Sequence, residues 1–244
     1  MGAQRRLMVV GAMPGNLGSM VYEEALKSRE WEQAKRYDIN GNLPGIPGSP
    51  SYLDLTNRRQ VIEALENFSP TDIVCTVGVN HTEANEATIA DSVRLHWNAN
   101  VNGPMQLLTE ALDLWKRWRW REPKAVPDTG FNFCSISSNS AHLARSQSAG
   151  YCASKAGLSM ALRCVARRVA MNPQLCIWGY EPGFLVGTPM SERTAEAFPT
   201  APLHRIPGGY GLDPHDLADR IVGDLIVASR SLNGCMMRID GGEQ

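Results

Sequence analysis

The chain has 244 residues, of which 43% are hydrophobic and 20% are charged, and its formal net charge is −1. This length suits one domain spanning residues 1–244, and the balanced charge excludes a disordered chain and a dedicated polyanion binder. No apolar run approaches the roughly 20 residues that cross a bilayer, so we expect a soluble globular protein without a membrane span.

From the N-terminus, the patterns predict strands at residues 7–10, 37–39 and 52–55, and helices at 19–31 and 58–67. A Pro- and Gly-rich stretch at 41–50 takes the place of a longer helix. A strand at 73–77, a long helix within 91–118, a strand at 131–136 and a helix at 148–171 follow. The last predicted elements are a strand at 175–179, a helix at 213–228 with Asp213 as its N-cap and Pro214 in its first turn, and a strand at 236–239. This alternation predicts a doubly wound α/β fold, in which a Rossmann-like parallel sheet forms a three-layer α/β/α sandwich.

The six cysteines and the N-terminal segment indicate the compartment. The cysteines are scattered, without a Cys-x-x-Cys pair or histidines at zinc spacing, so we expect reduced thiols and no metal site. Arg5 and Arg6 precede a short apolar run that stops at Gly11 without a cleavage site. A buried strand explains this run better than a secretory signal, and we expect a cytoplasmic protein.

The turn after the first predicted strand is rich in glycine, with the sequence Gly11-Ala12-Met13-Pro14-Gly15-Asn16-Leu17-Gly18. Glycines let the backbone turn tightly and approach a pyrophosphate at the N-terminus of the next helix. Asp38 lies 20 residues beyond Gly18 (38 − 18), where a carboxylate can accept hydrogen bonds from an adenosine ribose. Such a turn can also simply connect two elements, but its position after the first strand favours a nucleotide site.

A second group of residues indicates acid–base chemistry. Tyr151 and Lys155 are four residues apart and therefore share one face of a predicted helix. A nearby cation favours the phenolate form of a tyrosine, which brings the group toward useful proton transfer. Ser138 lies 13 residues before Tyr151 (151 − 138) and just past a predicted strand, where its hydroxyl can donate to a substrate oxygen. An isolated Tyr-x-x-x-Lys pair usually lies on an ordinary exposed helix surface. The presence of Ser138 at this spacing favours a catalytic site instead.

These segments resemble the compact short-chain dehydrogenases/reductases over nearly the whole chain. The family's active-site block is matched by Ser135-Ile136-Ser137-Ser138 and Tyr151-Cys152-Ala153-Ser154-Lys155-Ala156-Gly157. Its later motifs are matched by Glu181-Pro182-Gly183-Phe184, Thr188-Pro189-Met190, Arg205-Ile206-Pro207 through Asp213-Pro214, and Asp240-Gly241-Gly242. The resemblance implies an NAD(P)-dependent alcohol dehydrogenase or carbonyl reductase, which transfers a hydride between a nicotinamide cofactor and an alcohol or ketone.

The resemblance also implies a role for each matching residue. Tyr151 would be the general acid/base, Lys155 would lower its pKa and hold the nicotinamide ribose, and Ser138 would orient the substrate carbonyl. Asn100 matches the asparagine that positions a proton-relay water, with Asn98 and Asn102 as neighbouring candidates. Asp54 and Leu55 would contact the adenine, and Thr188 would hold the carboxamide. The resemblance implies the following cofactor-binding residues: Gly11, Gly15, Asn16, Leu17, Gly18, Asp38, Asp54, Leu55, Gly78, Tyr151, Lys155, Pro182, Gly183 and Thr188.

The sequence departs from the family's pattern near the cofactor. The third glycine comes one position late, at Gly18, so either the phosphate cradle is reshaped or Leu17 takes the usual third place. Cys75-Thr76-Val77-Gly78 replaces Asn-Asn-Ala-Gly and removes two amides that brace the sheet. Asp38 would repel a 2′-phosphate, so we expect NAD, with NADP not excluded.

Two other functions are consistent with parts of the sequence. A dinucleotide-binding regulatory protein with weak or lost catalysis would fit the altered glycine turn. A sugar-nucleotide epimerase or dehydratase would share the Tyr-x-x-x-Lys pair, but it usually needs a larger C-terminal substrate domain than this chain supplies.

The remaining features concern the substrate and the partners. The segment 184–210 is expected to cover the substrate pocket, and its apolar residues Leu185, Met190, Phe198 and Leu203 suggest a partly apolar small molecule. The basic, Trp-rich run 115–121 is typical of a helix end packed on the protein body, so we expect no nucleic-acid partner. By family resemblance, the long helices near 100–118 and 151–171 would pair across a two-fold axis in a homodimer or homotetramer.

Overall fold

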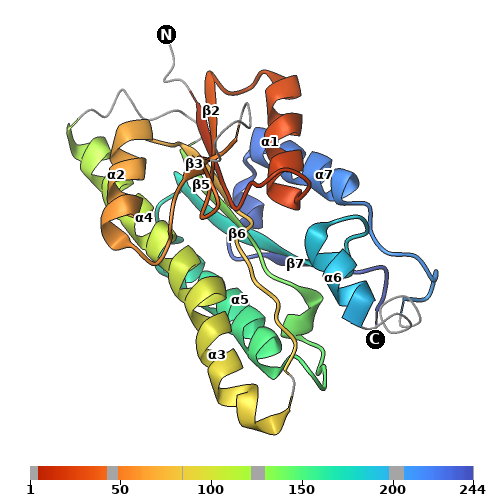
Figure 1. The fold of residues 1–244 in the computed structure, drawn as a ribbon. Coiled ribbons are helices and arrows are strands. Elements are labelled where there is room, and N and C mark those ends of the chain that lie inside the picture. The colour runs from red at the N-terminus through yellow and green to blue at the C-terminus, as the bar shows by residue number, and fades with distance from the viewer. Residues whose placement is uncertain (1–4, 43–48, 84, 122–129, 198–205, 244) are drawn as a thin grey trace.

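Seven parallel strands form the central sheet of the computed structural model, in the order β3-β2-β1-β4-β5-β6-β7 (Figure 1). The structure describes residues 5–42, 49–83, 85–121, 130–197 and 206–243. The strands are β1 (Arg6–Val10), β2 (Gln33–Asp38), β3 (Ser51–Tyr52), β4 (Asp72–Cys75), β5 (Phe131–Ile136), β6 (Leu175–Pro182) and β7 (Met236–Ile239).

Helices cover both faces of this sheet, which confirms the predicted three-layer α/β/α fold (Figure 1). Their bounds are α1 (Leu17–Ser28), α2 (Arg58–Phe68), α3 (Ile89–Trp97), α4 (Gly103–Arg121), α5 (Ala149–Val169), α6 (Pro189–Ala197) and α7 (Pro214–Val227). Helices α2, α4 and α5 pack on one face, and α1 and α7 pack on the other. Short turns of helix also occur at η1 (Glu86–Thr88), η2 (Asn98–Asn102), η4 (Asn139–Ala141) and η6 (Arg230–Leu232).

The central strands β1, β4, β5 and β6 are largely buried on both sides, because each side faces its own layer of helices. In β1, Met8 and Val10 join the core beneath α2, α4 and α5, whereas Leu7 and Val9 join the core beneath α1 and α7. All six residues of β5 are buried in the same alternating way. Such continuous burial is the pattern of parallel sheets, because successive side chains point to opposite faces.

Helix α1 differs from its predicted bounds of 19–31 at both ends. It begins at Leu17 because the Asn16 side chain accepts a hydrogen bond from the Ser19 amide at 3.1 Å and so acts as its N-cap. It ends at Ser28 because Arg29 adopts a left-handed conformation, with φ of 58°. Trp31 therefore lies outside the helix, where its indole donates to Asp72 at 2.9 Å.

The predicted long helix within 91–118 is divided into three parts. Between α3 and α4, the segment η2 is one turn of π-helix, which is wider than an α-helix and frequent at functional sites. The predicted strand at 52–55 is also shorter, because the Asp54 carboxylate accepts from the Thr56 amide at 2.8 Å and turns the chain. The predicted start of α7 is confirmed: Pro214 is its first residue, and Asp213 caps it by accepting from the His215 amide at 2.8 Å.

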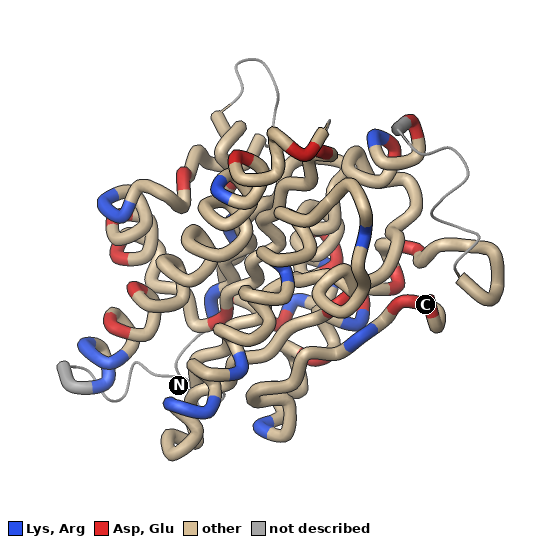
Figure 2. The backbone as a smooth tube through the Cα atoms, turned by 90° about the horizontal axis from the view of Figure 1, so that it is seen from below, with Lys and Arg blue, Asp and Glu red and all other residues tan. Residues whose placement is uncertain are grey.

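Charges of both signs are dispersed along the backbone rather than gathered by sign (Figure 2). No helix among the described residues has both the length and the hydropathy that crossing a membrane requires. Residues 43–48, within the predicted Pro- and Gly-rich stretch, lie outside the described part of the chain, as do residues 198–205 of the predicted substrate-covering segment.

Candidate active site

A cavity of about 780 Å³ opens at the carboxyl ends of β1, β4, β5 and β6. In a doubly wound sheet ligands bind at this edge, where the strand order reverses between β1 and β4. Most of the predicted site residues line the cavity: Gly11, Asn16, Leu17, Asp38, Asp54, Leu55, Gly78, Ser138, Tyr151, Lys155, Pro182, Gly183 and Thr188. Its volume is in the range of small-molecule and cofactor sites.

The glycine turn between β1 and α1 brings the backbone against the end of β4. Gly11 has φ of +87°, and a Cβ atom there would lie 2.8 Å from the Val77 amide nitrogen. Gly18 lies behind the cavity, where a Cβ atom would come within 2.5 Å of the Gly11 carbonyl oxygen. The late third glycine is therefore the one that allows close packing of α1 on the turn, and Leu17 lines the cavity instead.

The start of α1 provides the features expected of a phosphate site. Asn16 and Leu17, its N-cap and first residue, both line the cavity. The N-terminus of a helix carries partial positive charge and unpaired amides, which attract anions such as a pyrophosphate. Gly15 has φ of +84°, a conformation that favours glycine, but it does not line the cavity.

An acidic residue, Asp38, lies at the same end of the cavity as the glycine turn. Asp38 ends β2 and is 8% exposed, and its carboxylate accepts from the Asn40 amide at 2.9 Å. Arg36, the nearby cation, lies over the Tyr22 ring of α1, with its guanidinium carbon 5.1 Å from the ring centroid. A ribose that binds at Asp38 would therefore meet a carboxylate.

Thr76 takes over part of the bracing that was expected to be lost at the end of β4. Its hydroxyl donates to the carbonyl oxygens of Val10 and Gly11, at 3.1 and 2.9 Å. Gly78 leaves space for the Lys155 side chain, because a Cβ atom there would lie 3.0 Å from Lys155 Nζ.

Ser138, Tyr151 and Lys155 converge at the wall of the cavity. Ser138 follows β5 as the N-cap of η4, while Tyr151 and Lys155 lie in the first two turns of α5. The Ser138 hydroxyl hydrogen-bonds to Tyr151, and Lys155 Nζ lies 5.8 Å from the centroid of the Tyr151 ring. Lys155 also donates to the Ile136 carbonyl oxygen at 3.0 Å, which fixes its side chain across the end of β5.

Burial determines the protonation of both groups. It raises the pKa of Tyr151 above its ordinary value, while the Ser138 hydrogen bond and the charge of Arg145 act in the opposite direction. Burial also lowers the pKa of Lys155 from 10.5 to about 8. The pKa of Tyr151 was expected to be lowered, and the structure corrects this because desolvation outweighs the neighbouring charges.

Asn100 lies behind the cavity wall rather than in it. Its Oδ1 accepts from the Val79 amide at 2.8 Å, and its Nδ2 donates to the Val79 carbonyl and to Ser154 Oγ, at 3.0 and 2.9 Å. Asn98 and Asn102 instead bond to each other at the surface. Asn100 is fully buried, so its side chain braces the end of β4 against α5.

The loop after β6 forms another wall of the cavity. Gly183 is required by close approach, since a Cβ atom there would lie 2.9 Å from the Asp240 Cα atom. Thr188 caps α6 through Ser191, whose amide donates to the Thr188 hydroxyl at 3.3 Å. Phe184, Leu185 and Met190 add apolar surface beside these residues.

No motif in the sequence predicts the polar cluster that lies beside Ser138. Arg145 donates to Glu243 at 2.7 Å and to Ser140 Oγ at 3.0 Å, and Asn139 donates to the other carboxylate oxygen of Glu243 at 2.6 Å. All four residues line the cavity. Glu243 lies 98 positions after Arg145 and 104 after Asn139, so only the fold brings it to the site.

Two features outside the cavity have structural partners. Trp115 is 3% exposed and lies in the core beneath α4, which agrees with a packed helix end. His142 Nε2 contacts Glu181 Oε2 at 2.8 Å, and His142 does not line the cavity.

The chemistry that this arrangement permits is proton transfer beside a bound nucleotide. A phenol, a hydroxyl and an ammonium meet on one side of a cavity whose other end holds a glycine turn and a carboxylate. These residues fit a dinucleotide, because close backbone approach, a helix N-terminus and an acidic ribose site occur together.

Comparison with known proteins finds similarity in structure but not in sequence. No family model and no curated protein matches the sequence. A short-chain type dehydrogenase/reductase from Mycobacterium marinum superimposes with a TM-score of 0.82 and 21% identity, covering 98% of this chain and 95% of that one. An oxidoreductase of the short-chain dehydrogenase/reductase family from Burkholderia thailandensis gives 0.79 and 21%, covering 98% and 92%.

A third similar structure is the ligand-free aldohexose dehydrogenase of Thermoplasma acidophilum, with a TM-score of 0.76 and 20% identity over 98% of this chain and 94% of that one. At these identities, the similarity shows that the chain shares its fold with short-chain dehydrogenases/reductases.

Proposed function

We propose that the chain is an NAD(P)-dependent oxidoreductase of the short-chain dehydrogenase/reductase family, acting on a small alcohol or ketone. The observation that carries this proposal is the meeting of Ser138, Tyr151 and Lys155 at one wall of a cavity that fits a dinucleotide. The shared fold supports it, since the similar structures include dehydrogenases. Residues 1–244 would form one nucleotide-binding domain, with the segment 184–210 over the substrate.

A bound nicotinamide would supply or accept the hydride. Tyr151 Oη would donate a proton to the carbonyl oxygen of the substrate, and Ser138 Oγ would donate a hydrogen bond to that same oxygen. The ammonium of Lys155 would stabilise the tyrosinate that remains after proton transfer. Asn100 would act indirectly, by fixing the backbone of Val79 beside the site.

Burial of Tyr151 keeps its phenol in the protonated form, which is the form that reduction of a carbonyl would require. Because its pKa lies above the ordinary value, the phenol is protonated at neutral pH and is ready to act as an acid. In the oxidative direction the same group must first lose its proton, so that activity would increase with pH.

We further propose NAD as the cofactor. The Asp38 carboxylate lines the nucleotide end of the cavity and would repel a 2′-phosphate, while Arg36 lies over Tyr22. The six cysteines, all within the described residues, are free thiols, which supports a reducing compartment such as the cytoplasm.

A homodimer or homotetramer would form through α5, as expected, and through α3 in place of the helix expected near 100–118. Leu95, Trp97 and Met160 are exposed on these helices, and the Trp97 ring lies against Gly157 of α5, one turn before Met160. Large apolar side chains exposed together are typical of protein–protein contacts.

The decisive experiment replaces the phenol without changing the ring. We expect Tyr151→Phe to lower kcat by about 1,000-fold, since proton transfer contributes about 10²–10⁴. The dissociation constant for NADH should stay within about twofold, because Gly11, Asn16 and Asp38 are unchanged. The measurements are nicotinamide absorbance with NADH and NADPH over a panel of ketones and alcohols, and a fluorescence titration with each cofactor.

Tyr22→Phe is the matched control, since Tyr22 lies on α1 and does not line the cavity. Undiminished activity of Tyr151→Phe would overturn the mechanism. Cofactor binding without hydride transfer to any compound would instead favour the dinucleotide-binding regulatory protein.

A further inference from the structure

Helix α5 carries Tyr151 as its third residue, and it begins without a cap of its own. Within the described residues, the N-cap Ser148 makes no side-chain capping hydrogen bond, and the first turn contains no acidic residue. The first amides of a helix have no partner inside the helix and are costly to bury unpaired. A group from elsewhere must therefore satisfy the amides that precede Tyr151.

That group is the carboxylate of Glu83, which lies 66 positions before Ala149 in the chain. Its Oε1 accepts from the Gly150 amide at 2.8 Å, and its Oε2 accepts from the Ala149 amide at 3.0 Å. The backbone amide of Glu83 also donates to the Gln147 carbonyl oxygen at 3.0 Å. Glu83 is 8% exposed, so this carboxylate forms a buried cap placed at the positive end of the α5 dipole.

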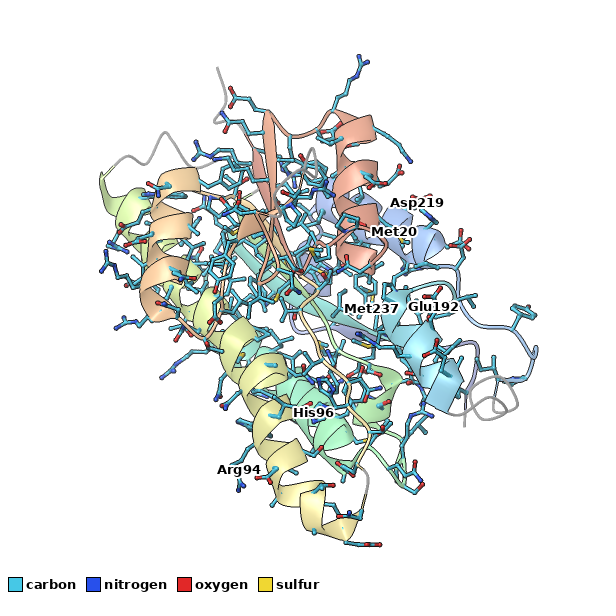
Figure 3. All side chains as sticks on the ribbon, in the orientation of Figure 1. Met20, Arg94, His96, Glu192, Asp219 and Met237 are labelled. Atoms are coloured by element: carbon cyan, nitrogen blue, oxygen red, sulfur yellow. The ribbon has the colours of Figure 1, made fainter. Side chains whose placement is uncertain are left out.

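Ser92 of α3 holds Glu83 in this position, and His96 of the same helix contacts Ser92. Ser92 Oγ donates to Glu83 Oε1 at 2.8 Å, and the Ser92 carbonyl oxygen lies 2.7 Å from His96 Nδ1. His96 Nε2 accepts from the His81 amide at 3.0 Å. Figure 3 shows His96 on the side of α3 toward α5, whereas Arg94 on the same helix points outward.

The protonation states agree with this hydrogen bonding. Burial raises the pKa of Glu83, but the hydrogen bonds from Gly150, Ser92 and Ala149 outweigh it and hold the pKa below its ordinary value. Burial lowers the pKa of His96, so the neutral ring can donate with Nδ1 and accept with Nε2. The network is thus fully paired at neutral pH.

The network also touches the tyrosine directly. The rings of His96 and Tyr151 meet edge to face, with centroids 6.0 Å apart. A Cβ atom at Gly150 would lie 2.6 Å from Ser92 Oγ, so the start of α5 packs tightly against α3. Any movement of Glu83 would therefore allow the residue that carries the phenol to move.

We infer that Glu83, supported by Ser92 and His96, is a positioning residue that holds the start of α5 and thereby aims Tyr151 at the substrate. This inference rests on the proposed function for its catalytic consequence. The capping itself does not depend on that function, and the two can be tested separately.

The test compares Glu83→Ala and Glu83→Gln with Glu86→Gln in the full chain, because Glu86 is exposed three residues later. We expect Glu83→Ala to lower kcat by about 10- to 100-fold through misalignment of the phenol. The dissociation constant for NADH should stay within about twofold. Glu83→Gln, which keeps one acceptor oxygen, should show a smaller loss, and Glu86→Gln should show none.

Hydrogen–deuterium exchange gives a readout independent of activity. Amides at 149–151 should exchange faster in Glu83→Ala than in the wild type or Glu86→Gln. If Glu83→Ala exchanges faster but the wild type shows no hydride transfer, the capping role of Glu83 would be supported and the proposed function would be refuted. The inference would be overturned if Glu83→Ala left the exchange of these amides unchanged. It would also be overturned if the wild type is active and Glu83→Ala either keeps the same kcat or loses kcat and NADH affinity equally.

Discussion

Lys155 carries its charge in an almost fully buried position at the cavity wall. The side chain is 3% exposed, and burial lowers its pKa from 10.5 to about 8. Between these two values the unfolded chain binds more protons than the folded one, so the contribution of Lys155 to the free energy of unfolding rises with pH. At neutral pH the buried ammonium therefore destabilises the fold, by about 3 kcal/mol at 1.36 kcal/mol per pKa unit.

We expect Lys155→Met to raise the free energy of unfolding at pH 7 by about 1–3 kcal/mol, because an apolar side chain replaces a buried charge. The difference from the wild type should shrink from pH 8 to 10.5, as the lysine in the folded wild type loses its proton. Urea unfolding at pH 7 and 9.5 measures both effects. Lys27→Met, at an exposed ion pair, should change little; a less stable Lys155→Met at pH 7 would contradict this expectation.

At the scale of elements, the contact between α1 and the end of β1 sets the shape of the proposed nucleotide site. Gly18 lies where a Cβ atom would come within 2.5 Å of both the Gly11 carbonyl oxygen and Thr76 Oγ1. The turn cannot relax easily, because the Gly11 and Ala12 amides both donate to the Tyr37 carbonyl oxygen, at 2.9 and 3.1 Å. A glycine is needed here for packing, although its spacing departs from that of the similar family.

Replacing Gly18 with alanine should therefore destabilise the protein by about 1–3 kcal/mol through overpacking and weaken NADH binding at the displaced turn. Gly223→Ala is the control: it lies in α7 with no atom within 4 Å of its Cβ position, and alanine there should stabilise by up to about 1 kcal/mol. Thermal unfolding and a cofactor titration measure both variants. Wild-type stability in Gly18→Ala would refute the packing role.

At the scale of the whole molecule, some of the exposed apolar residues lie on the adjoining helices α3 and α5. Met160 is 57% exposed on α5, and Leu95 and Trp97 on the adjoining α3 are 48% and 41% exposed. Association would bury the exposed sides of α3 and α5, while Glu83 holds the start of α5. Quaternary structure and active-site alignment would then be coupled.

We expect light scattering to show a dimer or tetramer for the wild type and a smaller species for Met160→Asp, because an interfacial carboxylate would be buried without a partner. Met171→Asp should leave the mass unchanged, since Met171 is 96% exposed just beyond the end of the same helix. A monomeric wild type, or an unchanged mass for Met160→Asp, would exclude this interface.

Local patterns were sufficient for the elements and for the residues whose chemistry depends on short spacing. The alternation of apolar runs determined the parallel sheet, and Asp213 determined the start of α7. Tyr151 and Lys155 were recognisable because helical geometry places residues four apart on one face. The predicted start of α1 and end of β3 were wrong because the side chains of Asn16 and Asp54 accept hydrogen bonds from nearby backbone amides.

Tertiary structure alone decided what depends on contacts between distant segments. Amino-acid order does not indicate that Glu83 caps α5 or that Glu243 pairs with Arg145, because neither pair has a fixed spacing. The direction of the pKa shifts of Tyr151 and Lys155 also followed from burial, which a sequence of neighbours does not specify. Burial from solvent arises only when the sheet and its helices pack together, so the pKa shifts that it causes follow from the folded structure.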